Sequence, residues 1–452
     1  MAGASADPAP GLIVAAPASG HGKTTVTLGL IAALRRRGLA VGSFKVGPDY
    51  IDPAFHAVAS GRPCLSLDDW AMRDATVAGV AAAVARDAEI VVGEGVMGLF
   101  DGAPDGTGST ADVAARLDLP VVLVLDVRAQ AASAAAVIHG FATYRSGLDV
   151  AGVVFNRVGS EGHVRALEAA CLDMPQVLLG SLPRDEALAL PERHLGLVQA
   201  GEHAALGGFI DRAAAAVEAH LDLDRLVGLA RPMRAPAGAG GPVVPVLGQR
   251  IAVARDMAFA FAYPHLIESW RAEGAEIAFF SPLADEGPDA AADAVYLPGG
   301  YPELHAGRLA GNRGFLGGLR DAAGRDAAIY GECGGYMVLG QGLVDGDGAS
   351  HAMAGLLPVE TSFAEPRLHL GYRAVRLVED GPLGEAGAGF RGHEFHYAGA
   401  TRGDGEAALF ECRDARGEAV GAAGCRAGSV FGSYIHLIDA AAPSVEMTTR
   451  TG

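Results

Sequence analysis

The sequence contains little lysine, little cysteine and no long hydrophobic run. Of the 35 basic residues only Lys23 and Lys45 are lysines, and the rest are arginines. The five cysteines are scattered, without the paired spacing of a zinc site or the density of a secreted disulfide framework, so we expect reduced thiols. No uninterrupted stretch of about 18 apolar residues could span a bilayer, and the N-terminus lacks a secretion-type pattern. We therefore expect a cytoplasmic protein without a membrane partner.

Positive charge is also in deficit, since the formal net charge is −18. Nucleic-acid binding depends on neutralising phosphates with basic residues, so this balance argues against a nucleic-acid partner. In a chain so rich in arginine, a lysine is expected where a compact point charge on a flexible stem is needed. Both lysines lie in the motifs described below.

The N-terminal half alternates short apolar runs with alanine-rich helical stretches. This pattern predicts βαβ units around a mostly parallel sheet, in a chain of 452 residues that is long enough for two or three domains. The first predicted helix covers residues 26–37. The predicted strands are residues 12–16, 90–92, 121–125, 150–155 and 177–179.

Residues 231–248 are rich in proline, glycine and alanine, which predicts a linker because such a sequence cannot sustain a helix. A second α/β pattern follows, with predicted strands at residues 251–254, 276–280, 294–297 and 328–331. The sequence therefore predicts an α/β protein with two domains, at residues 9–230 and 249–441, and a tail at residues 442–452.

A phosphate-binding loop is predicted at residues 17–25, PASGHGKTT, between the first predicted strand and the first predicted helix. A P-loop needs this context because amides of the loop and of the helix N-terminus must converge on phosphate oxygens. Lys23 is expected to meet the β- and γ-phosphates, and Thr24 to offer its hydroxyl to Mg²⁺. Pro17 replaces the usual first glycine, and a glycine-rich turn with an incidental lysine is the alternative. The predicted ATP-binding residues are Gly20, Gly22, Lys23, Thr24, Thr25 and Asn156, the last directly after the strand at 150–155.

Carboxylates follow the strand predicted at residues 90–92. Side chains at the carboxyl ends of parallel strands lie in the ligand crevice, so Glu94 is a candidate Mg²⁺ ligand and Asp101 a second. Ordinary acidic loop residues are the alternative for both. Residues 44–53, FKVGPDYIDP, combine Lys45 and Asp49 with two prolines that stiffen the loop. Such a rigid charged loop suits the orientation of an anionic acceptor beside the γ-phosphate.

A candidate nucleophile, Cys333, lies in the segment YGECGGYM at residues 330–337, directly after a predicted strand. A sharp strand-to-helix turn of this kind exposes the side chain and turns a following backbone N–H, here that of Gly334, toward an oxyanion. A thiol at a helix N-terminus is also expected to be more acidic. The pair of glycines in LPGGYPE at residues 297–303 offers Gly300 as a second oxyanion-hole amide.

The candidate general base is His436, in GSYIHL at residues 432–437. His393 and His396, in RGHEFHY at residues 391–397, compete with it. Spacing alone leaves the choice open.

Taken together, these motifs resemble the cobyrinic or hydrogenobyrinic acid a,c-diamide synthases of corrin biosynthesis. The resemblance covers nearly the whole chain, through the P-loop, KVGPDYID, EGVMGLFDG, LPGGYPE, YGECGGYM, GHEFHY and YIHL. The N-terminal half is also similar to dethiobiotin synthetase, and the C-terminal half to the variant class I glutamine amidotransferases of cobalamin enzymes. The resemblance implies a P-loop NTPase-type parallel sheet followed by an amidotransferase-like α/β domain.

The resemblance also implies roles for residues of the second domain. Cys333 matches the nucleophile that forms a γ-glutamyl thioester, and His436 the group that raises its nucleophilicity. Ordinary class I amidotransferases have a glutamate two positions after this histidine, whereas this chain has Ile438 there and Asp439 next. The variant family similarly lacks that acid, so a Cys/His pair with modest glutaminase activity is expected.

In the first domain the resemblance implies that several residues activate or select the acceptor carboxylate. Asp49, Glu94 and Asp101 match positions associated with ATP, metal and carboxylate activation, and Tyr50 and Ile51 match positions that tune which carboxylate is used. The expected sets are Lys45, Asp49, Tyr50, Ile51 and Asp101 for the acceptor, and Thr24 and Glu94 for the metal.

The implied activity is amidation of the a and c acetates of hydrogenobyrinic or cobyrinic acid, with ATP, Mg²⁺ and glutamine, in a family-like homodimer. Cobyric acid synthase, which amidates propionates, and a nickel-sirohydrochlorin diamide synthase share most motifs and are alternatives. A partitioning-type P-loop ATPase is weakened because residues 17–22 lack its early lysine. A non-catalytic scaffold is opposed by the intact Cys333 and His436.

Overall fold

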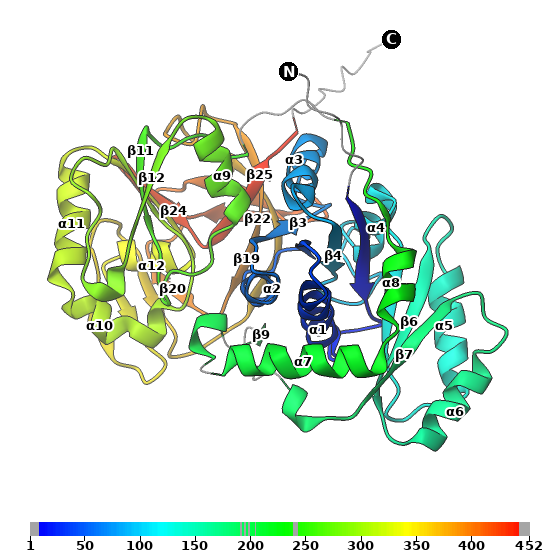
Figure 1. Ribbon diagram of the computed structural model, residues 1–452. Helices are drawn as coiled ribbons and strands as arrows, with labels where there is room; N and C mark the ends of the chain where they lie inside the picture. The colour runs from blue at the N-terminus through cyan, green and yellow to red at the C-terminus, as the bar shows by residue number, and fades with distance from the viewer. Residues whose placement is uncertain are drawn as a thin grey trace, which may run out of the picture. The chain divides into compact units, whose positions relative to one another are not determined.

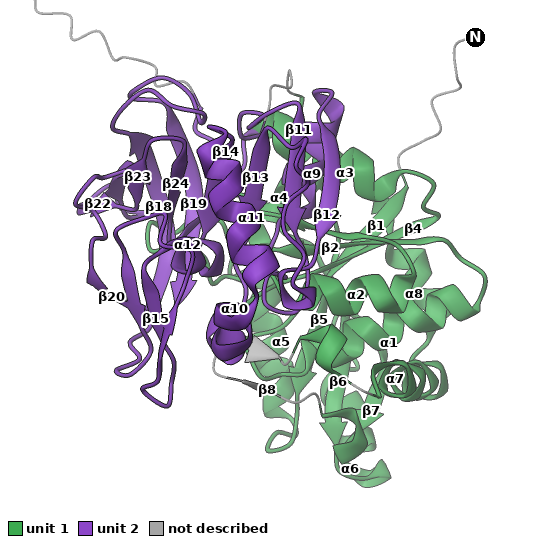
Figure 2. Ribbon diagram, turned by 90° about the vertical axis from the view of Figure 1, so that its left-hand side faces the viewer, with its two compact units in different colours: residues 1–70, 74–240 green, residues 71–73, 241–452 purple. Residues whose placement is uncertain are grey.

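The computed structural model describes residues 9–189, 192–193, 196–197, 199–203, 205–237 and 243–442. The chain divides into two compact units, drawn in different colours in Figure 2. Unit 1 comprises residues 1–70 and 74–240, and unit 2 comprises residues 71–73 and 241–452. Among the described residues, no helix combines the length and the hydrophobicity that a bilayer crossing requires.

Unit 1 is built on an eight-stranded sheet, in which the order β3-β2-β4-β1-β5-β6-β7 is parallel throughout and β10 pairs with β1 in the antiparallel sense. The central strands are continuous apolar runs, as expected for a parallel sheet covered on both faces. The strands are β1 (Pro10–Ala15), β2 (Val41–Val46), β3 (Cys64–Leu67), β4 (Ile90–Glu94), β5 (Val121–Asp126), β6 (Val150–Val158), β7 (Val177–Pro183) and β10 (Arg231–Pro232), with a separate pair β8 (Glu192–Arg193) and β9 (Gly196–Leu197).

The helices of unit 1 connect these strands and cover the sheet. They are α1 (Lys23–Arg36), α2 (Asp52–Ser60), α3 (Asp74–Ala85), α4 (Thr110–Leu117), α5 (Ser133–Thr143), α6 (Glu161–Ala170), α7 (Leu206–His220) and α8 (Leu223–Leu229), with short 3₁₀ turns at Glu186–Leu188 and Ala200–Glu202. Figure 1 shows α7 alongside α1. A Cβ at Gly29 of α1 would lie 2.7 Å from the carbonyl oxygen of Ala213 in α7, so the glycine permits this close packing.

Unit 2 combines a mainly parallel sheet with an antiparallel sheet and a smaller mixed sheet, in which β15 and β17 pair in parallel. The first has the order β12-β11-β13-β14-β24-β23, the second β22-β21-β18-β19-β25 and the third β16-β15-β17-β20. The strands of the first are β11 (Arg250–Ala254), β12 (Glu276–Phe280), β13 (Ala294–Leu297), β14 (Ala328–Glu332), β23 (Cys425–Ala427) and β24 (Val430–Ser433). The others are β15 (Gly342–Val344), β16 (Ser350–Ala352), β17 (Glu360–Ser362), β18 (His369–Leu377), β19 (Gly389–His396), β20 (Gly399–Arg402), β21 (Phe410–Arg413), β22 (Ala419–Ala423) and β25 (Ile435–Ala440).

The helices of unit 2 are few and short. They are α9 (Pro264–Ala272), α10 (Ala306–Gly311), α11 (Arg313–Gly324) and α12 (Gly334–Leu339), with 3₁₀ turns at Pro282–Ala284 and Pro302–His305. The core around α12 is apolar and includes Tyr336, Val338 and Leu339, which are buried. This packing fixes the turn that joins β14 to α12.

The α/β fold class predicted from the sequence is confirmed, and every predicted strand is present with similar bounds. The predicted linker at residues 231–248 is too long at both ends. Arg231 and Pro232 pair with Gly11 and Pro10, while Val244 and Leu247 are buried. Proline and glycine exclude a helix there but not strand pairing or apolar burial. Residues 238–242 of that linker and 443–452 of the predicted tail lie outside the described residues.

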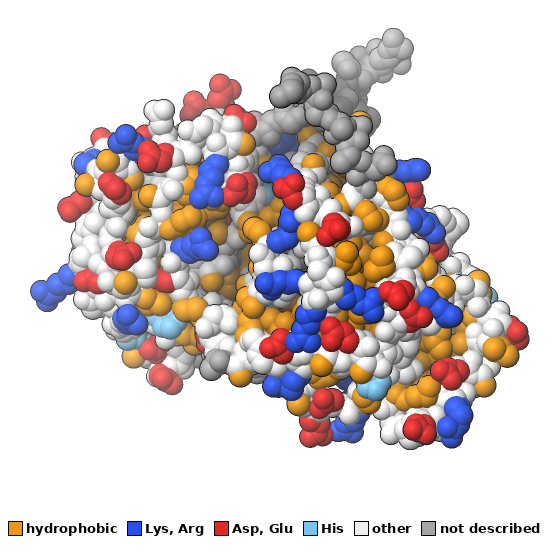
Figure 3. All heavy atoms as spheres, viewed as in Figure 1, with side chains coloured by type: hydrophobic (Ala, Val, Ile, Leu, Met, Phe, Trp, Pro, Cys, Tyr) orange, Lys and Arg blue, Asp and Glu red, His pale blue; other side chains and the backbone are white. Residues whose placement is uncertain are grey.

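The charge of the protein is dispersed on the face drawn in Figure 3. Acidic and basic side chains are interspersed there, and neither sign covers one continuous area. On this face the net negative charge therefore forms no single acidic surface.

Candidate functional site

The loop between β1 and α1 has the backbone conformation of a phosphate-binding turn. Gly20 and Gly22 have φ angles of 82° and 85°, in the left-handed region that glycine adopts at little cost. Gly22 directly precedes α1, which begins at Lys23. The amides of the first helical turn are thus available to an anion, and the helix dipole favours negative charge there.

Residues at the ends of two neighbouring strands hold this loop in place. Asn156 Nδ2 donates to the carbonyl oxygen of His21 at 2.9 Å, and the guanidinium of Arg157 donates to the carbonyl oxygen of Gly20 at 2.6 Å. The same guanidinium donates to Asp126 Oδ2 at 2.6 Å. The sequence predicted Asn156 but missed Arg157 and Asp126, although their positions at the ends of β6 and β5 are the signal that could have identified them.

A pocket with about 430 Å³ of empty space, partly open to solvent, adjoins the loop. Its lining includes Gly22, Thr25, Asn156, Arg157, Pro183 and Asp185. Three of the residues predicted to bind ATP therefore share one cavity within unit 1.

A cluster of oxygen and nitrogen atoms lies where α1, β2 and β4 meet. Thr24 Oγ1 lies 2.7 Å from Glu94 Oε1 and 3.2 Å from Asp52 Oδ2. Lys45 Nζ lies 2.8 Å and 2.6 Å from the same two carboxylate oxygens. The register of β2 against β4 places Lys45 opposite Glu94, so the sheet itself builds this contact. The structure thus brings together Thr24, Glu94 and Lys45, and adds Asp52, to which sequence reasoning gave no role of its own.

The cluster holds its groups in the charged state. Burial alone lowers the pKa of Lys45, but Asp52 and Glu94 raise it well above the ordinary lysine value. Burial raises the pKa of Glu94, yet the charges of Lys45 and His56 bring it far below the ordinary value. His56 Nε2 lies 2.6 Å from Glu94 Oε2, and this carboxylate raises the pKa of His56 to about 10 against the effect of burial. His56 was missed from the sequence, where it is an ordinary residue of an amphipathic helix.

The cluster is chemically suited to Mg²⁺. Carboxylate and hydroxyl oxygens are the ligands that this hard cation prefers. Thr24, Asp52 and Glu94 supply such oxygens within one hydrogen-bonded group. The residues present therefore fit a magnesium site.

The predicted acceptor residues lie on the loops around this cluster. Asp49 Oδ1 accepts from the backbone N–H groups of Ile51 and Asp52 at 2.9 and 3.0 Å, and burial raises the pKa of Asp49 to about 6. Tyr50 is partly exposed and Ile51 is buried. The exposed Asp101 accepts from the backbone N–H of Gly98 at 2.9 Å. Asp101 thus closes its own turn. Burial lowers the pKa of Lys23 to about 8, although the charges of Glu94, Asp52 and Asp101 act in the opposite direction.

In unit 2, Cys333 occupies a strained turn between β14 and α12. Its φ and ψ are 46° and −106°, a conformation that residues with a side chain rarely adopt. Its backbone N–H donates to the carbonyl oxygen of Ser433 at 2.8 Å, which continues the pairing of β14 with β24. Because β25 begins two residues after Ser433, this pairing carries His436 toward Cys333.

Glycine at position 299 allows the cysteine and the histidine to approach each other. A Cβ at Gly299 would lie 2.3 Å from His436 Cε1 and 3.2 Å from Cys333 Cβ. A Cβ at Gly334 would lie 3.0 Å from the backbone nitrogen of Gly300. The two predicted oxyanion-hole glycines are therefore neighbours, beside the predicted nucleophile and base.

Burial keeps the cysteine and histidine uncharged. It raises the pKa of the Cys333 thiol well above its ordinary value, and the charge of Glu303 acts in the same direction. Burial, with the charges of His393 and His396, lowers the pKa of His436 to about 3. The expectation of a more acidic thiol at a helix N-terminus was therefore wrong. The six-residue helix α12 cannot offset the loss of water around the sulfur.

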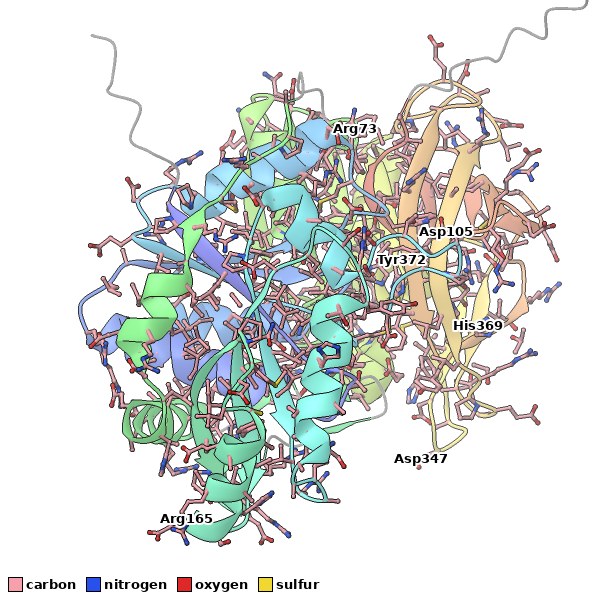
Figure 4. All side chains as sticks on the ribbon, turned by 90° about the vertical axis from the view of Figure 1, so that its right-hand side faces the viewer. Arg73, Asp105, Arg165, Asp347, His369 and Tyr372 are labelled. Atoms are coloured by element: carbon pink, nitrogen blue, oxygen red, sulfur yellow. The ribbon has the colours of Figure 1, made fainter. Side chains whose placement is uncertain are left out.

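The competing histidines have other surroundings. His393 lies opposite His436 in the β19–β25 register and forms an edge-to-face contact with Tyr372. His396 Nδ1 and Nε2 lie 2.9 Å from the carbonyl oxygen of Ala398 and from Glu394 Oε1, and its ring stacks on His369. Figure 4 labels His369 and Tyr372, both on β18. Of the three candidates, His436 is the one whose ring adjoins Gly299, the glycine that also lies beside Cys333.

Asp439, next to the position of the missing triad acid, is engaged by an arginine. The guanidinium of Arg73 donates to Asp439 Oδ1 at 2.7 Å, and the backbone N–H of Arg73 donates to Oδ2 at 2.8 Å. Arg73, labelled in Figure 4, belongs to the short segment 71–73 that is grouped with unit 2. Asp439 is therefore engaged in an ion pair with Arg73.

Comparison with known proteins reveals close relatives of nearly the same length. The chain is 55% identical over 431 residues to a hydrogenobyrinate a,c-diamide synthase of Brucella anthropi, covering 95% of this chain and 98% of that protein. It is 56% identical over 437 residues to the enzyme of the same name from a Sinorhizobium species, covering 95% and 99%. The chain belongs to the hydrogenobyrinate a,c-diamide synthase family. A further member, from Mesorhizobium japonicum, is 50% identical over 430 residues, covering 94% of this chain and 98% of that protein.

Two domain families match this member of the diamide synthase family, one in each half of the chain. Residues 12–198 match the CobQ/CobB/MinD/ParA nucleotide binding domain, and residues 250–443 match the CobB/CobQ-like glutamine amidotransferase domain. The resemblance noted in the motifs is confirmed. The alternative of a partitioning-type ATPase does not account for the amidotransferase domain at residues 250–443.

Proposed function

We propose that the protein converts the a and c acetate carboxylates of hydrogenobyrinate, or of its cobalt form cobyrinate, into amides, with ATP as the energy source and glutamine as the nitrogen donor. The observation that carries the proposal is the likeness, over 95% of the chain, to proteins named for this reaction. The cluster of Thr24, Lys45, Asp52 and Glu94 in unit 1 and the Cys333–His436 pair in unit 2 support the two half-reactions that amidation requires.

The first half-reaction activates a carboxylate. A free carboxylate does not react with ammonia at neutral pH, because hydroxide is a poor leaving group and the anion repels nucleophiles. Phosphoryl transfer from ATP to the carboxylate supplies a better leaving group, with Lys23 balancing charge on the transferred group. Thr24, Asp52 and Glu94 would hold Mg²⁺, which when bound neutralises phosphate charge.

The remaining predicted residues of unit 1 fit nucleotide and acceptor binding. In our proposal the pocket beside Gly22, Thr25 and Asn156 receives the nucleotide. Lys45 keeps Asp52 and Glu94 in place, and the charged loop around Asp49 faces the acceptor. The roles of Tyr50, Ile51 and Asp101 in selecting and activating the acceptor carboxylate belong to the same proposal.

The second half-reaction releases ammonia from glutamine. His436 accepts the proton of the Cys333 thiol as sulfur attacks the side-chain carbonyl carbon of glutamine. The backbone N–H groups of Gly300 and Gly334 stabilise the resulting oxyanion. Collapse expels ammonia, which takes the proton back from His436 and leaves a γ-glutamyl thioester. Water then hydrolyses the thioester to glutamate and regenerates the thiol, while ammonia displaces phosphate from the activated acetate. We further propose a cytoplasmic homodimer, as the family resemblance implies.

The proposal is tested by incubating the protein with Mg-ATP, glutamine and hydrogenobyrinic acid, and following amide formation by mass spectrometry. Two amidations are expected, both located on acetates by fragmentation of the product. Free ammonia should replace glutamine. Amidation of propionates would favour the cobyric acid synthase alternative. Absence of any amidation of hydrogenobyrinic and cobyrinic acids, with either nitrogen source, would overturn the assignment.

A further inference from the structure

We infer that Glu332, the residue directly before Cys333, acts as the acidic positioning residue for His436, in place of the glutamate that ordinary class I amidotransferases carry after the histidine. The inference rests on the proposed glutaminase function. It concerns how the histidine becomes able to accept a proton inside an apolar environment.

The usual location of the acid offers no carboxylate to the histidine. The residue two positions after His436 is Ile438, which is fully buried. The next residue, Asp439, carries a carboxylate, but both of its oxygens accept hydrogen bonds from Arg73. Apart from Glu394 of β19, whose charge raises the pKa of His436, a counter-charge for the protonated histidine has to come from another element.

Glu332 is fully buried, and its carboxylate oxygen Oε2 lies 3.9 Å from His436 Nδ1. Three donors fix its orientation. The hydroxyl of Tyr296 donates to Oε2 at 2.7 Å, the hydroxyl of Tyr330 donates to Oε1 at 2.7 Å, and the backbone N–H of Leu437 donates to Oε1 at 3.0 Å. Since Leu437 directly follows His436, the same carboxylate also positions the strand that carries the histidine.

Three elements together build this arrangement. Tyr296 lies on β13, Tyr330 and Glu332 on β14, and Leu437 on β25. The rings of Tyr296 and Tyr330 stack at 5.7 Å, and Tyr330 stacks on Phe431 of β24 at 5.2 Å. A carboxylate buried without partners would be costly, whereas one that accepts three hydrogen bonds inside a packed aromatic group is held in a single orientation.

The chemistry of the proposed reaction explains what a carboxylate does here. Proton transfer from Cys333 creates an imidazolium at His436, and burial opposes that charge because it lowers the pKa of His436 to about 3. A carboxylate on the Nδ1 side stabilises the imidazolium, as the third member of a Cys–His–acid triad does. The charge of Glu332 also raises the pKa of the Cys333 thiol, so the carboxylate assists by stabilising the imidazolium and not by acidifying the thiol.

The ionisation of Glu332 lies in the range of neutral pH. Burial raises its pKa to about 7, although the hydrogen bonds from Tyr296, Leu437 and Tyr330 favour the carboxylate. The titratable groups that act on the Cys333–His436 pair are Glu332 from β14, Glu303 from the 3₁₀ turn after β13, and His393, Glu394 and His396 from β19. As the pH falls below about 7, Glu332 becomes neutral and loses its effect on His436.

The test compares the full-length wild type with Glu332→Gln, which keeps the size and one carbonyl acceptor but removes the charge. The measurements are kcat/KM for glutamine hydrolysis and the rate of Cys333 alkylation by iodoacetamide, each between pH 5.5 and 9, with Cys333 modification read by peptide mass spectrometry. We expect the wild type to lose activity and alkylation rate as the pH falls through about 7. The variant is expected to lose at least about tenfold in kcat/KM at pH 8, the size of a general acid–base or charge effect, and to lack the acidic limb.

A second variant separates charge from structure. Tyr330→Phe leaves the charge of Glu332 but removes a donor that favours the carboxylate, so the acidic limb should move to higher pH. A purely structural role predicts instead that Glu332→Gln lowers activity equally at all pH values, keeps the limb and reduces thermal stability. That result, or unchanged kcat/KM and alkylation in Glu332→Gln, would overturn the inference.

Ammonia-dependent amidation by both variants is the control for intact folding of the chain. It also distinguishes this inference from the proposed function. If the wild type shows no glutaminase activity, the proposed function fails, and the alkylation profile still decides whether Glu332 acts on the Cys333–His436 pair.

Discussion

Both candidate sites contain buried groups but hold them in opposite charge states. In unit 1, Lys45, His56, Glu94 and Asp52 form a compact group of opposite charges, and the pKa values of Lys45 and Glu94 shift toward the charged forms. In unit 2, burial shifts Cys333 and His436 toward their neutral forms. Burial alone therefore does not determine the ionisation of these groups, because the charged or apolar partners beside each group decide it.

The difference matches what each half-reaction needs. A site for phosphate and carboxylate anions benefits from fixed charges that require no reorganisation when the ligand arrives. A neutral thiol is a weaker nucleophile than a thiolate. The neutral state of Cys333 therefore supports the proposal of modest glutaminase activity.

The variant with the greatest predicted loss of activity lacks the thiol of unit 2. Cys333→Ala should lower glutamine-dependent amidation by at least about a thousandfold, as loss of a nucleophile does in other covalent enzymes. Amidation with free ammonia should be unchanged, because the charged site in unit 1 is intact. Parallel assays with glutamine and with ammonium chloride measure both. Equal loss with the two nitrogen sources would contradict the division of labour between the sites.

A second variant tests whether the buried charged groups of unit 1 stabilise one another. Lys45→Ala leaves Asp52 and Glu94 buried beside each other without their shared cation, and breaking a buried pair in this way costs about 3–5 kcal/mol of unfolding free energy. Urea denaturation measures the change. Arg36→Ala is the matched control, since the Arg36–Asp211 pair is exposed, and such pairs contribute about 0–1 kcal/mol. Similar losses in both variants would contradict the proposed balance of charge.

A third variant, with a smaller predicted loss of activity, tests the close approach of His436 to Gly299. Gly299→Ala places a methyl group where His436 Cε1 would be only 2.3 Å away, so the histidine must move. A displacement of about 1 Å in a catalytic group can cost on the order of a hundredfold in rate. Glutaminase kinetics should show this loss while ammonia-dependent amidation persists. Gly317→Ala in α11, where a Cβ meets nothing within 4 Å, is the control and should be kinetically silent.

The smallest effect concerns backbone strain at the nucleophile. Because Cys333 has a φ of 46°, Cys333→Gly should be more stable than Cys333→Ala by about 1–2 kcal/mol, the cost of this region for a residue with a Cβ. Thermal denaturation of the two inactive variants measures it. An alanine variant as stable as the glycine variant would mean that the turn relaxes.

Most strands of the parallel sheets could be predicted from the sequence because they are apolar runs, whereas β2, β3 and β24 of the same sheets were missed. Strands β18 and β19 were not predicted because their buried and exposed residues alternate irregularly, and β25 was not predicted although it is almost wholly buried. The same limit applies to the sites. Thr24, Glu94 and Cys333 were proposed from motifs and His436 through the family resemblance, whereas Asp52, His56 and Arg157 join the proposed phosphate site only through strand register and tertiary contacts.

The strained turn at Cys333 also bears on how this chain could change over evolutionary time. A sequence selected only for stability would place glycine at position 333, since glycine adopts a positive φ without penalty. The cysteine at this position therefore carries a thermodynamic cost that glycine would avoid. Under the proposed function, a descendant that relied on free ammonia could lose the thiol and gain stability.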